Sequence, residues 1–343
     1  MRLILRPLEP RSAAAWDAFV TAHKDGTFFH RAAWQHVIQR TFGHQPYYVL
    51  AEQDGTVAGV LPLVHVKTAL FGNALTSVPF CVYGGPLAAD ADTLAALSVH
   101  AIQLMTRLRA KVVEFRYRDA VDSDWIERPE LYVTFRKPIT ASDEANLKAV
   151  PRKQRAMVRK GIQNGLTSVV SRRAEPLHRI YSESVRNLGT PVFARRYFEL
   201  LLDVFHDCSD VIIVLDDDSP IASVLNFYFR DEVLPYYGGG TLKARQRAGN
   251  DFMYWEVMRR ATAHGYRLFD FGRSKLGTGA YAFKHNWGFE PAPLRYRYHL
   301  QPDAGIPDHN PLNPKYRLLV SAWKKLPLPV ANALGPHIVR GLG

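Results

Sequence analysis

Cysteine and long hydrophobic runs are both scarce in this sequence. Cys81 and Cys208 are the only cysteines and lie far apart, so they form neither a disulfide framework nor a metal-binding pattern. The apolar part of the N-terminal stretch MRLILRPLEPRSAAAW is too short for a signal peptide, and no run reaches membrane-spanning length. We therefore expect a cytoplasmic protein in a reducing compartment, with no bound metal.

Acidic residues are fewer than basic ones. The chain has 32 Asp and Glu against 44 Lys and Arg, which gives a formal net charge of +12. This excess fits an acidic partner such as a phosphate, RNA or an anionic membrane surface, and it fits a plain basic soluble protein equally well. No low-complexity block interrupts the 343 residues, of which 47% are hydrophobic. Such a chain is long enough for two domains with separate cores.

Residues 232–289 hold the pattern around which we interpret the rest of the chain. An apolar run ends in the letters YYGGG, and a basic loop, LKARQRAGN, follows. Asn250 or Asp251 is expected to cap the next helix, because a short side-chain oxygen accepts the free amides of the first turn. A strand over 267–271 comes next and is expected to break at Gly272. This order of a strand, a glycine-bearing loop and a helix N-terminus favours binding of an anion, such as a phosphate or a developing oxyanion.

Hydrophobic periodicity and turn residues predict the other elements. Helices are expected over 13–22, 31–40, 92–109, 174–188 and 194–206. Strands are expected over 2–6, 47–52, 57–66, 111–117, 167–171, 211–215 and 221–229, with 131–137 as the last strand of a first domain.

A strand–YGG–helix–strand unit occurs twice in the chain. Residues 79–116 read PFCVYGG, a helix, then KVVEFR, and residues 235–273 read PYYGGG, a helix, then YRLFDFGR. The two copies predict two similar α/β (α+β) domains in tandem. We place the first domain at 1–141, the second at 142–302 and a tail at 303–343.

Residues 142–164 join the two halves and are rich in positive charge. Five basic residues fall within nine positions on a predicted helix: Arg152, Lys153, Arg155, Arg159 and Lys160. Such a run is usually a solvated helix face. The alternative is a phosphate-contacting ridge, in which Arg155 and Arg159 bind the substrate.

Several of these motifs, in this order, resemble the FemA/FemB-like aminoacyltransferases and the related BioF2-like (CelD-like) acetyltransferases of the GNAT superfamily. The resemblance rests on YYGGG, the helix after it, FDFG and AFKHNWGFE, on PRKQRAMVRKGIQNG, and on FHRAAWQHV and LPLVHVKTALFGNALTSVPFCVYGG in the first half. It covers about residues 25–300. It is closest to a FemAB-like subgroup that accompanies exosortase (PEP-CTERM) and exopolysaccharide systems. The resemblance implies two tandem GNAT-like domains, each a mixed β-sheet flanked by helices.

The resemblance also implies acyl transfer, whose oxyanion needs fixed donors and whose nucleophile must lose a proton. It makes Lys284 in AFKHNW the first candidate for a catalytic residue. The alternative is a lysine that only extends from a short amphipathic helix toward water. Tyr237 either orients a substrate or packs in the core, and Asp270 is either a general base or, as we favour, a structural residue.

Further residues are expected to bind the substrate. Arg273 and Lys275 lie in a glycine-rich segment, GRSKLGTG, which either folds over a substrate or is a plain surface loop. His285 either shuttles protons or is structural. Tyr83 and Arg116 are the first-domain counterparts, and a cleft between the domains is the expected acceptor site.

The sequence departs from the family pattern at two places. Members that bind coenzyme A carry Gln/Arg-x-x-Gly-x-Gly/Ala at a strand-to-helix turn, and here Arg247, Gly249 and Asn250 would bind the donor. Asp251 occupies the last position of that pattern, where its carboxylate would face the phosphates, and this argues against ordinary coenzyme A binding. Peptidoglycan-directed members carry a lysine where this chain has Ile38, which places the usual acceptor in doubt.

The tail over 313–343 is basic and apolar and has no acidic residue. Trp323, Lys324 and Lys325 suit a membrane interface, and the alternative is a helix and arm packed against the domains. We expect an N-acyl- or aminoacyltransferase that acts on a cell-envelope glycan or exopolysaccharide precursor, cytoplasmic and in peripheral contact with the inner membrane. Its co-substrate would be aminoacyl-tRNA or acyl-CoA, with no bound cofactor. The alternatives are an acyl-CoA-dependent GNAT acetyltransferase and a non-catalytic adaptor that binds RNA or membrane.

Overall fold

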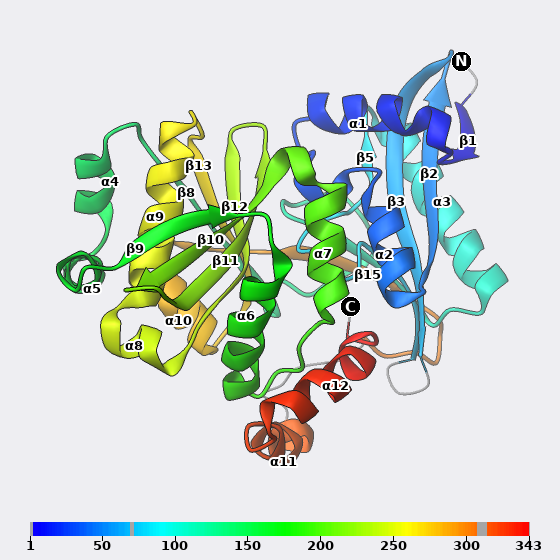
Figure 1. The fold of residues 1–343 in the computed structure, drawn as a ribbon. Coiled ribbons are helices and arrows are strands. Elements are labelled where there is room, and N and C mark those ends of the chain that lie inside the picture. Colours follow the sequence, from blue (N-terminus) through cyan, green and yellow to red (C-terminus); the bar gives the residue numbers. More distant parts are fainter. Residues whose placement is uncertain (1–2, 69–71, 307–313, 343) are drawn as a thin grey trace. The chain divides into compact units, whose positions relative to one another are not determined.

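The computed structural model describes residues 3–68, 72–306 and 314–342, and the chain divides into two compact units (Figure 1). Unit 1 comprises Met1–Leu131, Pro293–His309 and Arg340–Gly343, and unit 2 comprises Tyr132–Ala292 and Asn310–Val339. Each unit is a mixed β-sheet flanked by helices, as the sequence predicts.

Unit 1 is built on a sheet in the order β1-β2-β3-β4-β6-β15-β7, with β5 paired to β3. Its strands are β1 (Leu3–Pro7), β2 (Gln45–Gln53), β3 (Thr56–Thr68), β4 (Gly72–Ser77), β5 (Leu87–Ala88), β6 (Val112–Tyr117), β7 (Ile126–Glu127) and β15 (Arg295–Leu300). Its α-helices are α1 (Ala13–Ala22), α2 (Trp34–Phe42) and α3 (Ala91–Leu108). Side chains alternate across the strands: Val49 and Ala51 join the core beneath α3, whereas Tyr48 stacks on Trp16 of α1.

Unit 2 is built on a sheet in the order β14-β8-β13-β12-β11-β10-β9. Its strands are β8 (Tyr132–Pro138), β9 (Thr167–Ser171), β10 (Ser209–Asp216), β11 (Ser219–Phe229), β12 (Glu232–Gly240), β13 (Leu268–Lys275) and β14 (Pro291–Pro293). Its helices are α4 (Asp143–Ala149), α5 (Arg152–Gln163), α6 (Ala174–Leu188), α7 (Arg195–Val204), α8 (Leu242–Arg247), α9 (Gly249–Ala263), α10 (Gly279–Asn286), α11 (Pro314–Trp323) and α12 (Leu328–Val339).

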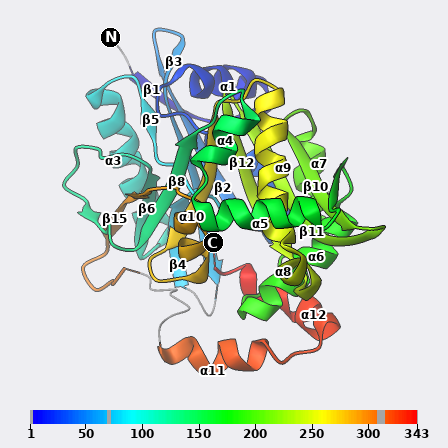
Figure 2. The same cartoon turned by 90° about the vertical axis from the view of Figure 1, so that its left-hand side faces the viewer.

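Helices cover both faces of the unit 2 sheet, and the three glycines at the end of β12 allow them to approach closely. A Cβ on Gly239 would lie 2.7 Å from the Cβ of Ser184 in α6. A Cβ on Gly238 would lie 2.8 Å from the hydroxyl of Tyr254 in α9, on the opposite face. The helix α5 in turn packs across α9 (Figure 2). The triple glycine is therefore a packing device between two helix layers.

The same topology occurs in both units, so the repeat read from the sequence exists at the level of the fold. In unit 1 the strands β2, β3 and β4 are antiparallel, α3 crosses over, and β6 returns parallel to β4. In unit 2 the strands β10, β11 and β12 are antiparallel, α9 crosses over, and β13 returns parallel to β12. The YGG letters are not equivalent, however. Gly238 lies within β12, whereas Gly84 lies in a loop after β4, where its amide donates to the carbonyl of Arg116.

The expected domain boundaries differ from those of the structure, because unit 2 begins at Tyr132 and unit 1 also contains Pro293–His309. The strand β8, expected as the last strand of the first domain, pairs with β13 in unit 2. The strand β15, placed within 142–302, pairs with β6 in unit 1. Strand pairing between segments so far apart is set by tertiary packing, which local patterns do not encode.

The tail forms two helices that pack on unit 2. Gly189 ends α6 with φ +85°, and a Cβ there would lie 2.5 Å from Val320 of α11. Gly335 of α12 lies against the backbone of Val192. A Cβ added at Gly335 would lie 2.8 Å from the carbonyl oxygen of Val192. Within the described residues, no helix is long and apolar enough to cross a membrane.

Candidate functional site

The strands β12 and β13 run side by side over only two residue pairs. Glu232 pairs with Leu268 and Val233 with Phe269, and beyond them no pairing between these strands occurs in the described part of the chain. Tyr236 is an extra residue in the ladder with β11, since Leu225 pairs with Tyr237 while Asn226 pairs with Pro235. A bulge and two parting strands expose backbone groups that a regular sheet would bond, and such places recur beside active sites.

Lys284 extends from α10 to β13, close to the end of this short parallel ladder. Its Nζ donates to the carbonyl oxygens of Gly272 (3.1 Å) and Arg273 (3.0 Å) and lies 5.8 Å from the ring centroid of Phe135. These bonds use two of the three ammonium hydrogens, and no third acceptor contacts Nζ among residues 3–68, 72–306 and 314–342. Burial lowers the pKa of Lys284 to about 7, although nearby Asp270 acts in the opposite direction.

Asp270 is buried in β13 beneath the lysine. One carboxylate oxygen accepts the amide of Gly272 at 2.6 Å, and the other lies 3.2 Å from Nε of Arg136 on β8. Arg136 also forms an ion pair with Glu232 on β12. Arg136 therefore links the three neighbouring strands β8, β13 and β12, and Asp270 supplies the negative charge that raises the pKa of Lys284. These contacts fit the structural role that we favoured from sequence.

Gly272 does not end the strand, contrary to the prediction. Its φ of +66° and the bond from its amide to Asp270 form a bulge, after which β13 continues to Lys275. Arg273 and Lys275 consequently lie in a strand rather than in a loop. Both stack over the ring of Tyr132 on β8, at 4.5 Å and 5.3 Å from its centroid. Whether they bind a substrate stays a prediction.

Tyr237 lies in a buried aromatic cluster. Its hydroxyl is 2.9 Å from the hydroxyl of Tyr197 on α7, and its ring makes edge contacts with Tyr181, Phe193 and Phe198. This surrounding matches the core alternative. Tyr254 of α9, which the sequence analysis did not single out, also lies beside β12. Its hydroxyl is 2.8 Å from the position of a Cβ added at Gly238 and makes no hydrogen bond within the described chain. The sequence around Tyr254 does not predict this position, because helical periodicity alone does not show where the hydroxyl of a partly buried tyrosine points.

The expected donor loop is helical and differs from the prediction. The first six residues of LKARQRAGN form α8, which Thr241 caps, and α9 begins at Gly249 without a side-chain cap. Arg247 donates to Asp216 (2.9 Å) and to the carbonyl of Asn164 (2.8 Å), so its guanidinium links two segments of unit 2. Gly249 packs close to Ala244, and the side-chain oxygen of Asn250 is buried without a hydrogen-bond partner within the described residues.

Asp251 faces the interior rather than the turn between α8 and α9. Its carboxylate accepts the indole N–H of Trp287 at 2.9 Å, and burial raises its pKa although bonds from Trp287 and Gln154 act against the rise. The expectation that this carboxylate would face donor phosphates was therefore wrong. The neighbouring helices α5, α9 and α10 meet at this buried acid.

The basic residues of α5 divide between two faces. Arg159 is exposed together with Arg152, Lys153 and Lys160, so the helix presents a continuous cationic face to solvent. Arg155 is partly buried, and its Nε is enclosed without a partner within the described chain. This arrangement allows both a solvated face and a phosphate-contacting ridge, and the role of Arg155 and Arg159 stays a prediction.

Tyr83 and Arg116 lie in unit 1 and are both buried. The guanidinium of Arg116 donates to Glu114 (2.6 Å) and to the carbonyls of Val78 (2.9 Å) and Cys81 (2.8 Å), which fixes the loop after β4. Tyr83 makes an edge contact with Phe29. These contacts account for both residues as supports of the unit 1 core, and their proposed part in substrate binding is untested.

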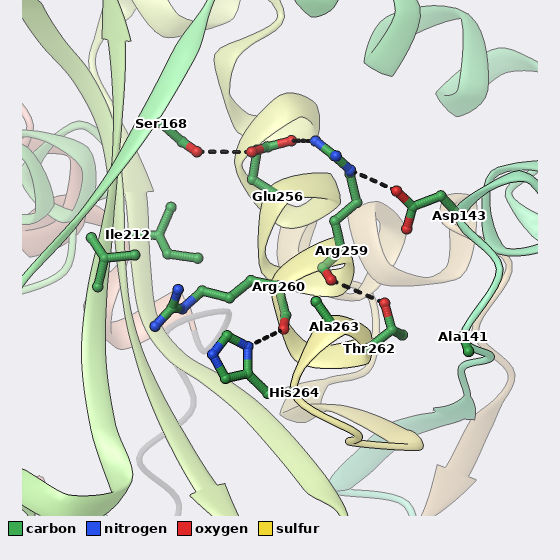
Figure 3. A pocket seen from close by; sticks show the side chains of 11 residues that line it. Ala141, Asp143, Ser168, Ile212, Glu256, Arg259, Arg260, Thr262, Ala263 and His264 are labelled. Carbon is green, nitrogen blue, oxygen red and sulfur yellow. Dashed lines mark hydrogen bonds and ion pairs between the residues drawn. The ribbon is translucent and has the colours of Figure 1, made fainter.

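A concave region of about 500 Å³ lies along the C-terminal half of α9, beside β9 and β10 (Figure 3). Its charged side chains are paired: Arg259 bonds Asp143 (2.8 Å) and Glu256 (2.9 Å), and Glu256 accepts from Ser168 (2.8 Å). Arg260 bonds Asp210 (3.0 Å), which lies outside the lining. The lining includes none of the site residues expected from sequence. Since its charges are already neutralised, this region is not the candidate site.

Comparison with known proteins finds one family model that matches part of the second unit. Residues 152–285 match the family model described as an acetyltransferase (GNAT) domain. No curated protein gives a significant match to the chain. The enzyme prediction, an acyltransferase, is confirmed over the adaptor alternative.

Solved structures resemble most of the chain, not only residues 152–285. FemX is 16% identical with a TM-score of 0.67 and covers 93% of this chain and 100% of its own. A tandem GNAT protein from the clavulanic acid biosynthesis pathway is 12% identical with a TM-score of 0.56, covering 88% and 100%. The C-terminal domain of a putative lysylphosphatidylglycerol synthetase from Agrobacterium fabrum is 13% identical with a TM-score of 0.52, covering 84% and 91%. At these identities the likeness shows the fold, two tandem GNAT-like domains.

Proposed function

We propose that this acyltransferase moves an aminoacyl or other acyl group from an anionic donor to an amine of a cell-envelope glycan or exopolysaccharide precursor. The observation that carries the proposal is Lys284, a partly buried amine beside the parting strands with a pKa of about 7 and one N–H left for a substrate. FemX and a lysylphosphatidylglycerol synthetase domain, both similar in fold, support aminoacyl transfer.

The reaction requires a charge to be stabilised and a proton to be moved. The acceptor amine attacks the acyl carbonyl carbon, the carbonyl oxygen becomes an oxyanion, and the bond to the donor oxygen or sulfur then breaks. The amine loses a proton, and the leaving alkoxide or thiolate gains one. As an ammonium, Lys284 stabilises the oxyanion; as a neutral amine it accepts the proton of the nucleophile. A pKa near neutral pH makes both forms available.

The donor is anionic in either version of the proposal. The exposed cationic face of α5 supports a phosphate-rich donor, because phosphates bind to clustered Arg and Lys. Acyl-coenzyme A is the second candidate, and the position of Asp251 favours it. Its carboxylate bonds Trp287 inside the unit, so it does not repel a pyrophosphate at the start of α9.

Ligand-induced thermal stabilisation tests the donor. The full chain is heated with aminoacyl-tRNA, uncharged tRNA or acetyl-coenzyme A, and a ligand at 100 times its dissociation constant adds about 2.7 kcal/mol of stability. A shift with aminoacyl-tRNA that uncharged tRNA does not reproduce supports aminoacyl transfer. A shift with acetyl-coenzyme A alone assigns the acetyltransferase alternative. No shift with any of the three contradicts both donors.

Replacing Lys284 by Met tests the catalytic role. Acyl transfer to glucosamine, followed with a radiolabelled donor, should fall at least about 100-fold if the amine stabilises the oxyanion or moves the proton. Lys137→Met is the matched control, since Lys137 is also partly buried, donates to a backbone carbonyl (Ala149, 3.0 Å) and lies over a phenylalanine ring. A variant at Lys284 that keeps its turnover, or equal losses in both variants, would contradict the proposal.

A further inference from the structure

The two tail helices each have one face docked on unit 2 and one apolar face left outside. In α11, Val320 lies against Gly189, and the backbone carbonyl of Lys324 accepts a bond from Arg186 of α6 at 3.3 Å. The neighbouring Leu318 and Leu319 are 81% and 66% exposed. Their exposure is therefore a property of a docked helix rather than of a loose end.

The second helix repeats this arrangement. In α12 the residues Ala331, Gly335 and Val339 are buried at a spacing of four, while Val330 and Leu334, also four apart, are 42% and 47% exposed. Residues spaced by four share one side of a helix, so α12 has an inner stripe and an outer apolar stripe. The four exposed side chains Leu318, Leu319, Val330 and Leu334 define what we call the tail surface.

Two exposed lysines lie close in sequence to the residues of the tail surface. Lys324 and Lys325 are both exposed and lie between the two pairs of apolar residues in the sequence. After Asp308 the chain contains five Lys and Arg and no acidic residue. The stem of Lys324 lies along Gly189, at 3.1 Å from Cε to the position of an added Cβ, and the residue remains exposed. Exposed aliphatic side chains and exposed lysines in one short segment match the boundary of an anionic bilayer, where the apolar groups enter the acyl region and the ammonium groups meet the lipid phosphates.

A second copy of the chain fits the tail surface less well. Two copies meeting there would bring their lysines together, and a protein with a net charge of +12 repels itself. We infer that the tail surface is a docking site for an anionic lipid bilayer. This inference does not depend on the proposed reaction.

Vesicle sedimentation with the full chain tests the inference. At low salt the protein should bind vesicles that contain phosphatidylglycerol and should bind vesicles of phosphatidylcholine alone much more weakly. Leu318→Ser combined with Leu319→Ser should lower the partition coefficient about tenfold or more, and Lys324→Gln with Lys325→Gln should lower it by a similar factor. High salt should weaken binding of the wild type.

The matched control is Val169→Ser with Val170→Ser. These two valines are 45% and 48% exposed on β9, in the same unit, and removing them should leave vesicle binding unchanged. Melting temperatures of all variants confirm that they fold. The inference is overturned by absent vesicle binding, by binding that the leucine variant retains, or by a soluble dimer in sedimentation velocity that the leucine variant abolishes.

Discussion

The low pKa of Lys284 has a consequence for stability that can be measured without knowing any substrate. Burial lowers this pKa from an ordinary 10.5 to about 7, so the folded protein binds the lysine proton less tightly than the unfolded chain does. Between about pH 7 and 10.5 the unfolded chain therefore carries more protons, and the free energy of unfolding rises with pH across that window. The cost of the buried amine is largest below pH 7 and disappears above the unfolded pKa.

Lys284→Met removes this cost. With these two pKa values, the buried amine costs about 4 kcal/mol at pH 7 and about 1 kcal/mol at pH 9.5. Met also leaves the carbonyls of Gly272 and Arg273 without their donor, a loss of about 1 kcal/mol for each bond. The variant should consequently be more stable than the wild type at pH 7 by roughly 2 kcal/mol. Its advantage should fall by about 3 kcal/mol between pH 7 and pH 9.5.

Urea denaturation of wild type and variant at several pH values between 6 and 9.5 measures both quantities. The change with pH is the sharper test, because the lost hydrogen bonds contribute equally at each pH. Lys148→Met, which removes an exposed lysine of α4, controls for the general effect of losing one positive charge. A difference between wild type and Lys284→Met that stays constant with pH would refute the reasoning, since the amine would then be solvated and fully charged at neutral pH.

Two further predictions concern neighbouring positions. Asp270→Asn removes the negative charge that raises the pKa of Lys284. The acid limb of the pH profile of kcat/KM should therefore move to lower pH, while the variant remains folded. An unchanged acid limb would show that the charge of Asp270 does not set the pKa that governs activity. Gly239→Ala should destabilise the protein by about 1–3 kcal/mol, because its Cβ would lie 2.7 Å from that of Ser184. The matched change Gly279→Ala, in open space at the start of α10, should instead stabilise the protein by about 0.5–1 kcal/mol. Equal changes in the free energy of unfolding for the two variants, measured by urea denaturation, would contradict the packing role of the glycines in β12.

Local patterns predicted the helices and the duplicated topology well. The helices over 13–22 and 174–188 appear with those limits as α1 and α6, because each has an apolar stripe, and Gly189 marks the end of α6. The parallel return strands β6 and β13 were also found, since each follows a long helix and contains alternating apolar residues. These features depend on residues close together in sequence.

The predictions that were wrong depend on tertiary contacts. The sequence predicts a strand end at Gly272, but the buried carboxylate of Asp270 holds this glycine in a bulge. The sequence also predicts that Asp251 faces phosphates, but its carboxylate accepts the indole N–H of Trp287, 36 positions later, inside the unit. In both cases a buried carboxylate accepts a hydrogen bond from a specific N–H group. Because a buried carboxylate without a donor is costly, this bond outweighs the local conformational preference of the sequence. Lys284 was found only through the resemblance, since an amphipathic helix and a lysine carry no such information alone.

The exchange of strands between the halves of the sequence also decides how the candidate site is assembled. Phe135 and Arg136, which contact Lys284 and Asp270, belong to β8 and precede the expected start of the second domain at residue 142. A second domain cut at that residue would expose one edge of β13, solvate the amine and leave Asp270 buried without its guanidinium partner. An unpaired buried carboxylate is strongly unfavourable. The pKa of Lys284 and the charge balance beneath it are therefore properties of a sheet completed by the first half of the chain.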